Sequence, residues 1–98
     1  MNTHFLLYRS KARKKIQTET IVDILAKSIR NNREEGLTGF LHTYDDQFLQ
    51  YLEGPQGPLM RKVARIQKDR RHTDFLILAE GEVEERLFPD WEMGQIAD

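Results

Sequence analysis

The chain has 98 residues, which is the size of a single domain. Its 15 Lys and Arg residues nearly cancel its 16 Asp and Glu residues, and the net charge of -1 argues against a nucleic-acid-binding protein with a basic excess. The absence of cysteine excludes disulfides, a thiolate nucleophile and a cysteine-rich zinc site. The longest unbroken apolar run, residues 75–79, is far too short to cross a bilayer. We therefore expect one soluble domain, without a metal site or a membrane span, that folds in a reducing compartment such as the cytoplasm.

Hydrophobic periodicity and turn residues predict six elements in chain order. They are a strand at residues 4–8, a helix that starts at Thr20 and stops at Gly36, strands at 37–44 and 47–52, a helix at 59–66 and a strand at 75–79. The polar, basic residues 9–15 are expected to form a loop. A last short strand is expected within residues 86–96, beyond a turn at Pro89-Asp90.

The element order β-α-β-β-α-β, with a fifth strand at the end, predicts an α+β fold. Two helices and a mixed five-stranded sheet separate most simply into a ferredoxin-like sandwich, with both helices on one face of the sheet. Residues 75–79 are apolar on both faces, which is typical of a central strand that is covered on both sides. This architecture occurs in enzymes, RNA binders and sensors, so it does not decide the function.

Two carboxamides occupy positions where apolar side chains are expected. Asn32 projects into the middle of the apolar stripe of the first helix, with Asn31 at its flank. Gln50 shares one face of its strand with Phe48 and Leu52. A buried carboxamide costs about 1–3 kcal/mol if its hydrogen bonds are unmade, so each needs a partner. Two simpler explanations stay open: Asn32 can bond the last carbonyls of its helix, and Gln50 can face solvent if the register is shifted by one residue.

Three further polar positions lie near the same region. Tyr8 shares a strand face with Ser10, and Arg65 and Asp69 stand four residues apart on the second helix. Taken singly, Tyr8 is most simply a core aromatic, and Arg65 and Asp69 are most simply a solvated ion pair. Together with the carboxamides, these groups could surround an apolar pocket between the helices. A carboxamide can match a ligand edge that alternates donor and acceptor, such as the imide edge of a flavin ring, which is one candidate among several.

Six short motifs follow one another along the chain. They are Tyr8-Arg9-Ser10, Asn31-Asn32, Gly36-Leu37-Thr38-Gly39, Phe48-Leu49-Gln50-Tyr51-Leu52-Glu53-Gly54-Pro55, Asp69-Arg70-Arg71-His72 and Arg86-Leu87-Phe88-Pro89-Asp90-Trp91-Glu92-Met93-Gly94. Each motif is weak on its own. In this order and spacing, they resemble the BLUF family of blue-light sensors that use flavin, over essentially the whole chain.

The resemblance implies a ferredoxin-like domain that holds FAD non-covalently between the two helices. It implies that Tyr8 gives an electron and a proton to the excited flavin, and that the side chain of Gln50 then rotates or tautomerises to give a red-shifted signalling state. The flavin contacts implied by position are Tyr8, Asn31, Asn32, Gln50, Arg65, Asp69 and His72. Ser10, Trp91 and Met93 would relay the change, with Trp91 or Met93 passing it into the sheet. Tyr8, Asn32 and Gln50, the polar residues at positions where apolar side chains are expected, are thus among those that the resemblance places at the flavin.

The resemblance further implies a photosensor rather than an enzyme. We expect residues 1–98 to be a single photosensory core without an effector domain, which passes its signal to a partner or effector. A sheet face left uncovered favours a homo-oligomer. The basic residues 11–15 could touch the FAD phosphates, although a solvated loop is the simpler expectation.

Two rival functions fit the same fold class. A small hydrolase of the acylphosphatase type would need an anion-binding loop with a catalytic arginine, for which Arg9 or Arg13 could serve, but the asparagines Asn31 and Asn32 end a helix. An RNA-recognition module needs paired aromatics on central strands and usually a basic face, which the charge balance does not favour.

Overall fold

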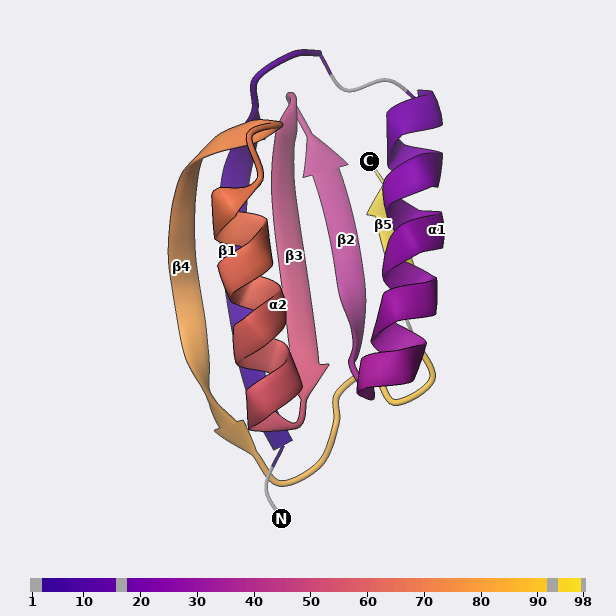
Figure 1. Cartoon of the computed structure of the whole chain (residues 1–98), viewed down its shortest axis with the longest axis vertical. Helices are drawn as coiled ribbons and strands as arrows, with labels where there is room; N and C mark the ends of the chain where they lie inside the picture. The colour runs from indigo at the N-terminus through magenta and orange to yellow at the C-terminus, as the bar shows by residue number, and fades with distance from the viewer. Residues whose placement is uncertain (1–2, 16–17, 92–93, 98) are drawn as a thin grey trace.

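The computed structural model describes residues 3–15, 18–91 and 94–97 of the chain. Its elements are β1 (Thr3–Ala12), α1 (Thr18–Glu35), β2 (Thr38–Tyr44), β3 (Gln47–Gly54), α2 (Gln56–Lys68), β4 (His72–Val83) and β5 (Gly94–Ala97). Both helices lie on the same face of one sheet, with α2 crossing β1 and β3 and α1 running beside β2 and β5 (Figure 1). No helix of this described part is long and apolar enough to cross a membrane.

The strand order in the sheet is β4-β1-β3-β2-β5. The pairs β1–β3, β1–β4 and β2–β3 are antiparallel, so four strands in the order 4-1-3-2 carry two helical crossovers, as in a ferredoxin-like sandwich. The short β5 pairs in parallel with β2. The predicted α+β class, with two helices on one face of the sheet, is confirmed (Figure 1).

Two predicted boundaries near the N-terminus are wrong. Residues 9–12 continue β1, whereas a loop was expected, because Arg9 and Lys11 pair with Leu49 and Gln47 of β3 and keep their long polar side chains exposed. A strand with one solvent-exposed face can carry such polar residues at alternate positions, and a prediction from apolar runs does not include them. The first helix begins at Thr18, two residues before the expected start, and ends before Gly36 as expected. Gly36 takes a φ of 71°, the left-handed conformation that commonly terminates a helix.

The prediction that residues 75–79 form a central, doubly covered strand is also wrong. They belong to β4, which lies at the edge of the sheet. Leu76 and Leu78 are each 46% exposed and Ile77 is 37% exposed. An apolar run cannot distinguish a strand buried on both faces from an edge strand that leaves apolar side chains uncovered.

The core between the sheet and the helices changes character along β1. At one end Leu6 packs with Leu52 of β3 and Leu59 of α2, all at most 1% exposed, and each such burial contributes about 1.5–3 kcal/mol. Farther along the same face, β1 presents Tyr8 and Ser10, which are buried as well. Polar groups are thus buried under the helices at this second end.

The opposite face of the sheet holds a buried carboxylate. Glu53 is 0% exposed and accepts hydrogen bonds from the Thr38 and Tyr51 hydroxyls at 3.0 and 3.1 Å. It also accepts bonds from the backbone N–H groups of Leu87 and Phe88, both at 2.8 Å. These contacts fasten the segment that follows β4 across the outer face.

Aromatic rings surround this anchor point. Phe88 packs edge-on against Phe40 and Tyr51, with ring centroids 5.3 and 5.5 Å apart, and Trp91 lies 5.1 Å from Phe88. The two faces of the sheet are therefore different in kind, with the helices and the core on one and an aromatic cluster on the other.

Candidate functional site

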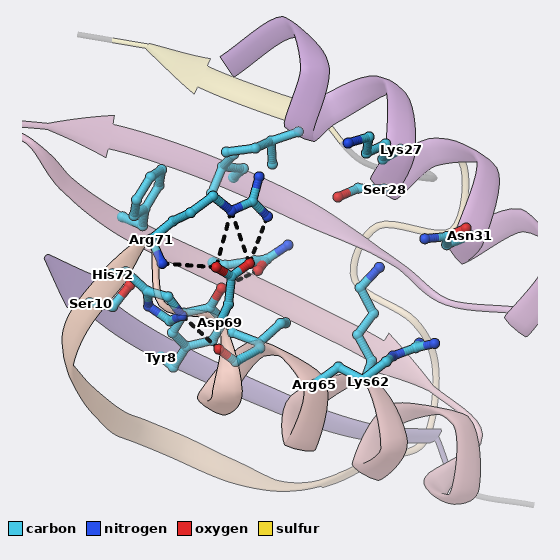
Figure 2. Close-up of a pocket in the computed structure, with 15 residues that line it drawn as sticks. Tyr8, Ser10, Lys27, Ser28, Asn31, Lys62, Arg65, Asp69, Arg71 and His72 are labelled. Atoms are coloured by element: carbon cyan, nitrogen blue, oxygen red, sulfur yellow. Dashed lines mark hydrogen bonds and ion pairs between the residues drawn. The ribbon is translucent and has the colours of Figure 1, made fainter. Parts of the chain in front are cut away.

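A cavity of about 280 Å³ lies between α1, α2 and the sheet (Figure 2). Its walls include seven of the residues singled out in the sequence: Tyr8, Ser10, Asn31, Gln50, Arg65, Asp69 and His72. Apolar side chains of both helices and the sheet complete it, among them Ile24, Leu41 and Ile66. An apolar enclosure with a few convergent polar groups is the usual form of a small-molecule site.

Tyr8 and Gln50 meet at the sheet side of the cavity. They are register partners on the neighbouring strands β1 and β3, so their side chains leave the sheet on the same face. They are 5% and 4% exposed, and the Tyr8 hydroxyl donates a hydrogen bond to Oε1 of Gln50. The alternative that Gln50 faces solvent is therefore wrong.

The surroundings of Tyr8 keep its hydroxyl protonated. Its ring stacks on Phe75 of β4 with centroids 4.6 Å apart. Burial raises the pKa of Tyr8 well above its usual value, and the negative charge of Asp69 adds to the effect. The phenol thus remains a hydrogen-bond donor throughout the physiological pH range.

The two asparagines at the end of α1 have different surroundings. Asn31 is exposed at the α1 side of the cavity (Figure 2). Asn32 is 0% exposed and its Oδ1 accepts a hydrogen bond from Nζ of Lys62 at 2.6 Å, while its backbone carbonyl accepts from the N–H of Leu37. The side chain of Asn32 therefore bonds across to α2, whereas the simpler expectation was a bond to the last carbonyls of its own helix.

Arg65 and Asp69 do not form the ion pair that their spacing suggested. Arg65 bonds Glu35 of α1 at 2.6 Å, and Asp69 accepts a two-pronged interaction from the guanidinium of Arg71, with distances of 2.6 to 3.0 Å. The ion pair expected for residues four apart on a helix does not form because α2 ends at Lys68, so Asp69 lies beyond the last helical turn. The hydrogen bonds from Arg71 hold the pKa of Asp69 below its usual range.

Two buried polar atoms beside the cavity have no hydrogen-bond partner among the described residues. They are Oγ of Ser10, on a residue only 2% exposed, and Nδ1 of His72, whose other ring nitrogen contacts the Ile66 carbonyl at 2.6 Å. Buried polar groups are rarely left unpaired, so each such atom calls for an explanation. Both line the space that a ligand would occupy.

Comparisons with known proteins point to one family. Residues 3–94 match the family described as sensors of blue-light using FAD. The chain belongs to the BLUF family. The photoactivated adenylate cyclase subunit beta of Euglena gracilis is 31% identical over 87 residues, which are 88% of this chain and 10% of that relative. The chain thus spans about a tenth of the length of this curated relative.

Solved structures give the same result. The dark-state structure of BlrB, a BLUF protein, superposes with a TM-score of 0.92 and 31% identity over 98% of this chain and 73% of that chain. Klebsiella pneumoniae BlrP1 with FMN and cyclic diGMP superposes with a TM-score of 0.89 and 27% identity over 97% of this chain and 26% of that chain. This BLUF domain is therefore a blue-light sensor domain, of a kind that also occurs in photoactivated adenylate cyclase subunits.

Of the three residues expected to relay a signal, Ser10 borders the cavity, Trp91 lies outside it and Met93 lies outside the described residues. Trp91 of the BLUF domain packs on Phe88 at the outer face of the sheet and is 41% exposed, and it is not among the cavity-lining residues. Its backbone carbonyl accepts a bond from the N–H of Gly39 at 2.8 Å. Met93 lies outside the described residues, so its expected role stays a prediction.

Four polar residues that border the cavity of the BLUF domain were not singled out in the sequence, namely Lys27, Ser28, Lys62 and Arg71. Arg71 was not singled out because its role depends on the chain reversal after α2. Lys62 carried a readable signal, since it follows Leu59 by three residues and precedes Ile66 by four, which places a cation on the apolar stripe of α2. The reasoning that identified Asn32 would have identified Lys62 as well.

Proposed function

We propose that this BLUF domain binds FAD non-covalently in the cavity and senses blue light through Tyr8 and Gln50. The observation that carries the proposal is the buried hydrogen bond from the Tyr8 hydroxyl to the Gln50 carboxamide at the wall of a ligand-sized cavity. A phenol is an electron and proton donor, and a carboxamide has a donor end and an acceptor end that can exchange.

The groups around the cavity suit a flavin. The imide edge of the ring carries two carbonyl acceptors and one N–H donor, which carboxamides match. Gln50 and Asn31 border the cavity, and the unpaired Oγ of Ser10 and Nδ1 of His72 add further polar groups. A volume of about 280 Å³ is at the small end of ligand pockets, so we expect it to hold the ring system while the rest of the dinucleotide extends outside.

A bound flavin supplies the absorption of blue light and an acceptor for charge. Tyr8 would give an electron and its hydroxyl proton to the excited flavin, which would remove the donor that holds Oε1 of Gln50. Gln50 would then reorient or tautomerise, and the electron and proton would return to Tyr8, so that only the hydrogen bonds to the imide edge differ. This exchange would give the red-shifted state, while Asn31, Asn32, Arg65, Asp69 and His72 would hold the ring in place.

We further propose that the signal leaves through the sheet to a protein partner or effector. Ser10, Trp91 and Met93 are the candidate relay residues, and the exposed apolar side chains of β4 favour a second copy of the chain on the outer face. Size-exclusion chromatography with light scattering tests the oligomer. FAD rather than FMN, and the cytoplasmic location, stay predictions from the sequence.

The decisive experiment is a visible absorption spectrum of the purified protein in the dark and directly after blue light. A flavin spectrum that shifts to the red and recovers in the dark supports the proposal. A flavin spectrum that bleaches or stays fixed supports the cofactor and contradicts the Tyr8–Gln50 switch. A colourless protein that cannot be reconstituted with FAD contradicts the proposal as a whole.

The rival functions receive less support from the geometry. Arg9, a candidate anion ligand of a hydrolase, is exposed within β1 and belongs to no loop. On the outer face, where an RNA-recognition module would stack bases, Phe88 already packs over Phe40 and Tyr51. Assay of the purified protein with acyl phosphates tests the hydrolase directly.

A further inference from the structure

Lys62 occupies a buried position of α2 where an apolar side chain would be expected. It lies on the face of α2 that carries Leu59 and Val63, and it is 7% exposed. Its side chain extends from α2 toward α1 and borders the cavity (Figure 2). Lysine is almost never this deeply buried without a compensating partner.

The partners of Lys62 in the protein do not neutralise its charge. Nζ donates one hydrogen bond, to Oδ1 of Asn32 at 2.6 Å, and this is its one partner among the described residues. An ammonium group has three donors. The nearby carboxylate of Glu35 is bonded to Arg65 at 2.6 Å. Burial lowers the pKa of Lys62, and the charge of Glu35 opposes that effect.

From this geometry we infer that Lys62 is a charge-tuning residue of the flavin site. Its ammonium group would supply a hydrogen-bond donor and a positive charge to the ring from the α2 side of the cavity. The inference rests on the proposed flavin site and names a residue that the family motifs quoted above do not contain. It explains why a buried cation is kept on the face of α2 that carries Leu59 and Val63.

The expected effect follows from electrostatics in a poorly solvated cavity. Oxidised flavin is neutral and its ring becomes more negative when it gains electrons or loses the imide proton. A nearby buried cation stabilises the negative forms, and its attraction is much stronger there than in water. Lys62 therefore makes the bound flavin easier to reduce and its imide proton easier to remove.

The test compares Lys62→Met with Lys68→Met in the flavin-loaded protein. Methionine keeps most of the length of the side chain and removes the charge, while Lys68 lies at the exposed end of the same helix and does not border the cavity. We expect Lys62→Met to shift the oxidised-to-reduced equilibrium of the bound flavin about tenfold toward the oxidised form, a fall of about 30 mV for a two-electron couple. In the dark, an absorbance titration should show the pKa of the imide proton raised by about one unit, again tenfold.

Lys62→Arg separates charge from shape. It should retain a potential closer to the parent than Lys62→Met does, because the guanidinium keeps the charge. If Lys62→Met loses flavin altogether, the inference requires Lys62→Arg to retain it, and loss from both variants would mean that Lys62 acts through shape alone and would overturn the inference.

The two proposals fail in different ways. A parent protein that holds no flavin contradicts the proposed function and this inference together. A parent that holds flavin and shifts to the red, with a Lys62→Met potential and imide pKa equal to those of Lys68→Met, leaves the photosensor intact and rejects the role of Lys62 alone.

Discussion

The hydroxyl of Tyr8 donates a hydrogen bond to the side-chain carbonyl of Gln50, which faces it directly across the β1–β3 ladder. Both side chains thus extend from paired positions of two inner strands, and each of these strands is hydrogen-bonded to a neighbour on both sides. A switch built on such a pair can change its hydrogen bonds while the strands stay in place.

Tyr8→Phe should keep the flavin and lose the photocycle, because phenylalanine can donate neither the electron nor the proton. The measurement is the light-minus-dark absorption spectrum at equal flavin content. Tyr44→Phe is the matched control, since Tyr44 stacks on His42 and does not border the cavity. A normal red shift in Tyr8→Phe would contradict the role assigned to Tyr8.

Gln50→Leu should bind flavin and lack the red shift, because leucine fills the same space without a donor or an acceptor. The variant also leaves the Tyr8 hydroxyl without its partner, at a cost of about 1–3 kcal/mol in the free energy of unfolding. Light-minus-dark spectra and chemical denaturation measure the two effects. A difference spectrum equal to that of the parent would show that Gln50 is not the switch.

Asp69→Asn should remove an acid-sensitive part of the stability. The pKa of Asp69 is lowered by its hydrogen bonds with Arg71, so this contribution is present above the unfolded value of about 3.8 and is lost as the pH falls through the folded value. The Arg71 side chain is 62% exposed, which limits the contribution to about 1 kcal/mol or less. Thermal melts from pH 7 down to pH 3 should show a smaller fall for Asp69→Asn than for the parent, and parallel curves would contradict the assignment. Asp90→Asn is an exposed control.

Glu53→Leu should release the segment that crosses the outer face. Four donors lose their acceptor, namely the hydroxyls of Thr38 and Tyr51 and the N–H groups of Leu87 and Phe88. We expect a loss of about 3 kcal/mol in the free energy of unfolding and faster hydrogen exchange in this segment. Trp91 is the single tryptophan, so its fluorescence reports the release directly. Glu84→Leu, at an exposed position, is the control, and equal fluorescence and exchange in both variants would contradict the anchoring role.

Lys62→Met should change how the stability of the flavin-free protein depends on pH. The variant loses a buried charge, which favours folding, but it also loses the hydrogen bond to Oδ1 of Asn32, which costs about 1–3 kcal/mol. The pKa of Lys62 is lowered by burial, so between the folded value and about 10.5 the unfolded chain binds more protons, and the stability of the parent rises with pH. The stability of the variant relative to the parent should therefore fall as the pH approaches 10. Denaturant titrations of both proteins at pH 7 and pH 9.5 measure this change, and the same difference at both values would refute this account.

The sequence predicted the residues of the site better than their contacts. Asn32, Gln50 and Tyr8 stood out because each places a polar group on an apolar face; all three are buried, and Tyr8 and Gln50 border the cavity whereas Asn32 does not. The partners of Arg65 and Asp69 were not predictable, because they depend on where α2 ends and on how the following turn returns to it. The tertiary geometry determines such pairs, and this geometry cannot be inferred from the spacing of residues along one helix.

The fold was predictable where periodicity was strong and failed where it was ambiguous. The two helices and the middle hairpin follow from apolar spacing and from the turn at Asp45-Asp46, where both residues take positive φ. The edge position of β4 could not be inferred, because an apolar run has the same appearance in a buried strand and in an exposed one.

The alternation along β3 limits how this domain can vary. Gln50 and Leu52 face the helices, while Tyr51 and Glu53 between them hold the aromatic and carboxylate contacts of the other face. Each side chain of residues 50–53 thus makes contacts on one face of the sheet. A single-residue insertion would turn the side chains that face the helices to the outer face, and the outer ones to the helices. Natural variation and laboratory libraries should therefore find few tolerated changes in this stretch of β3.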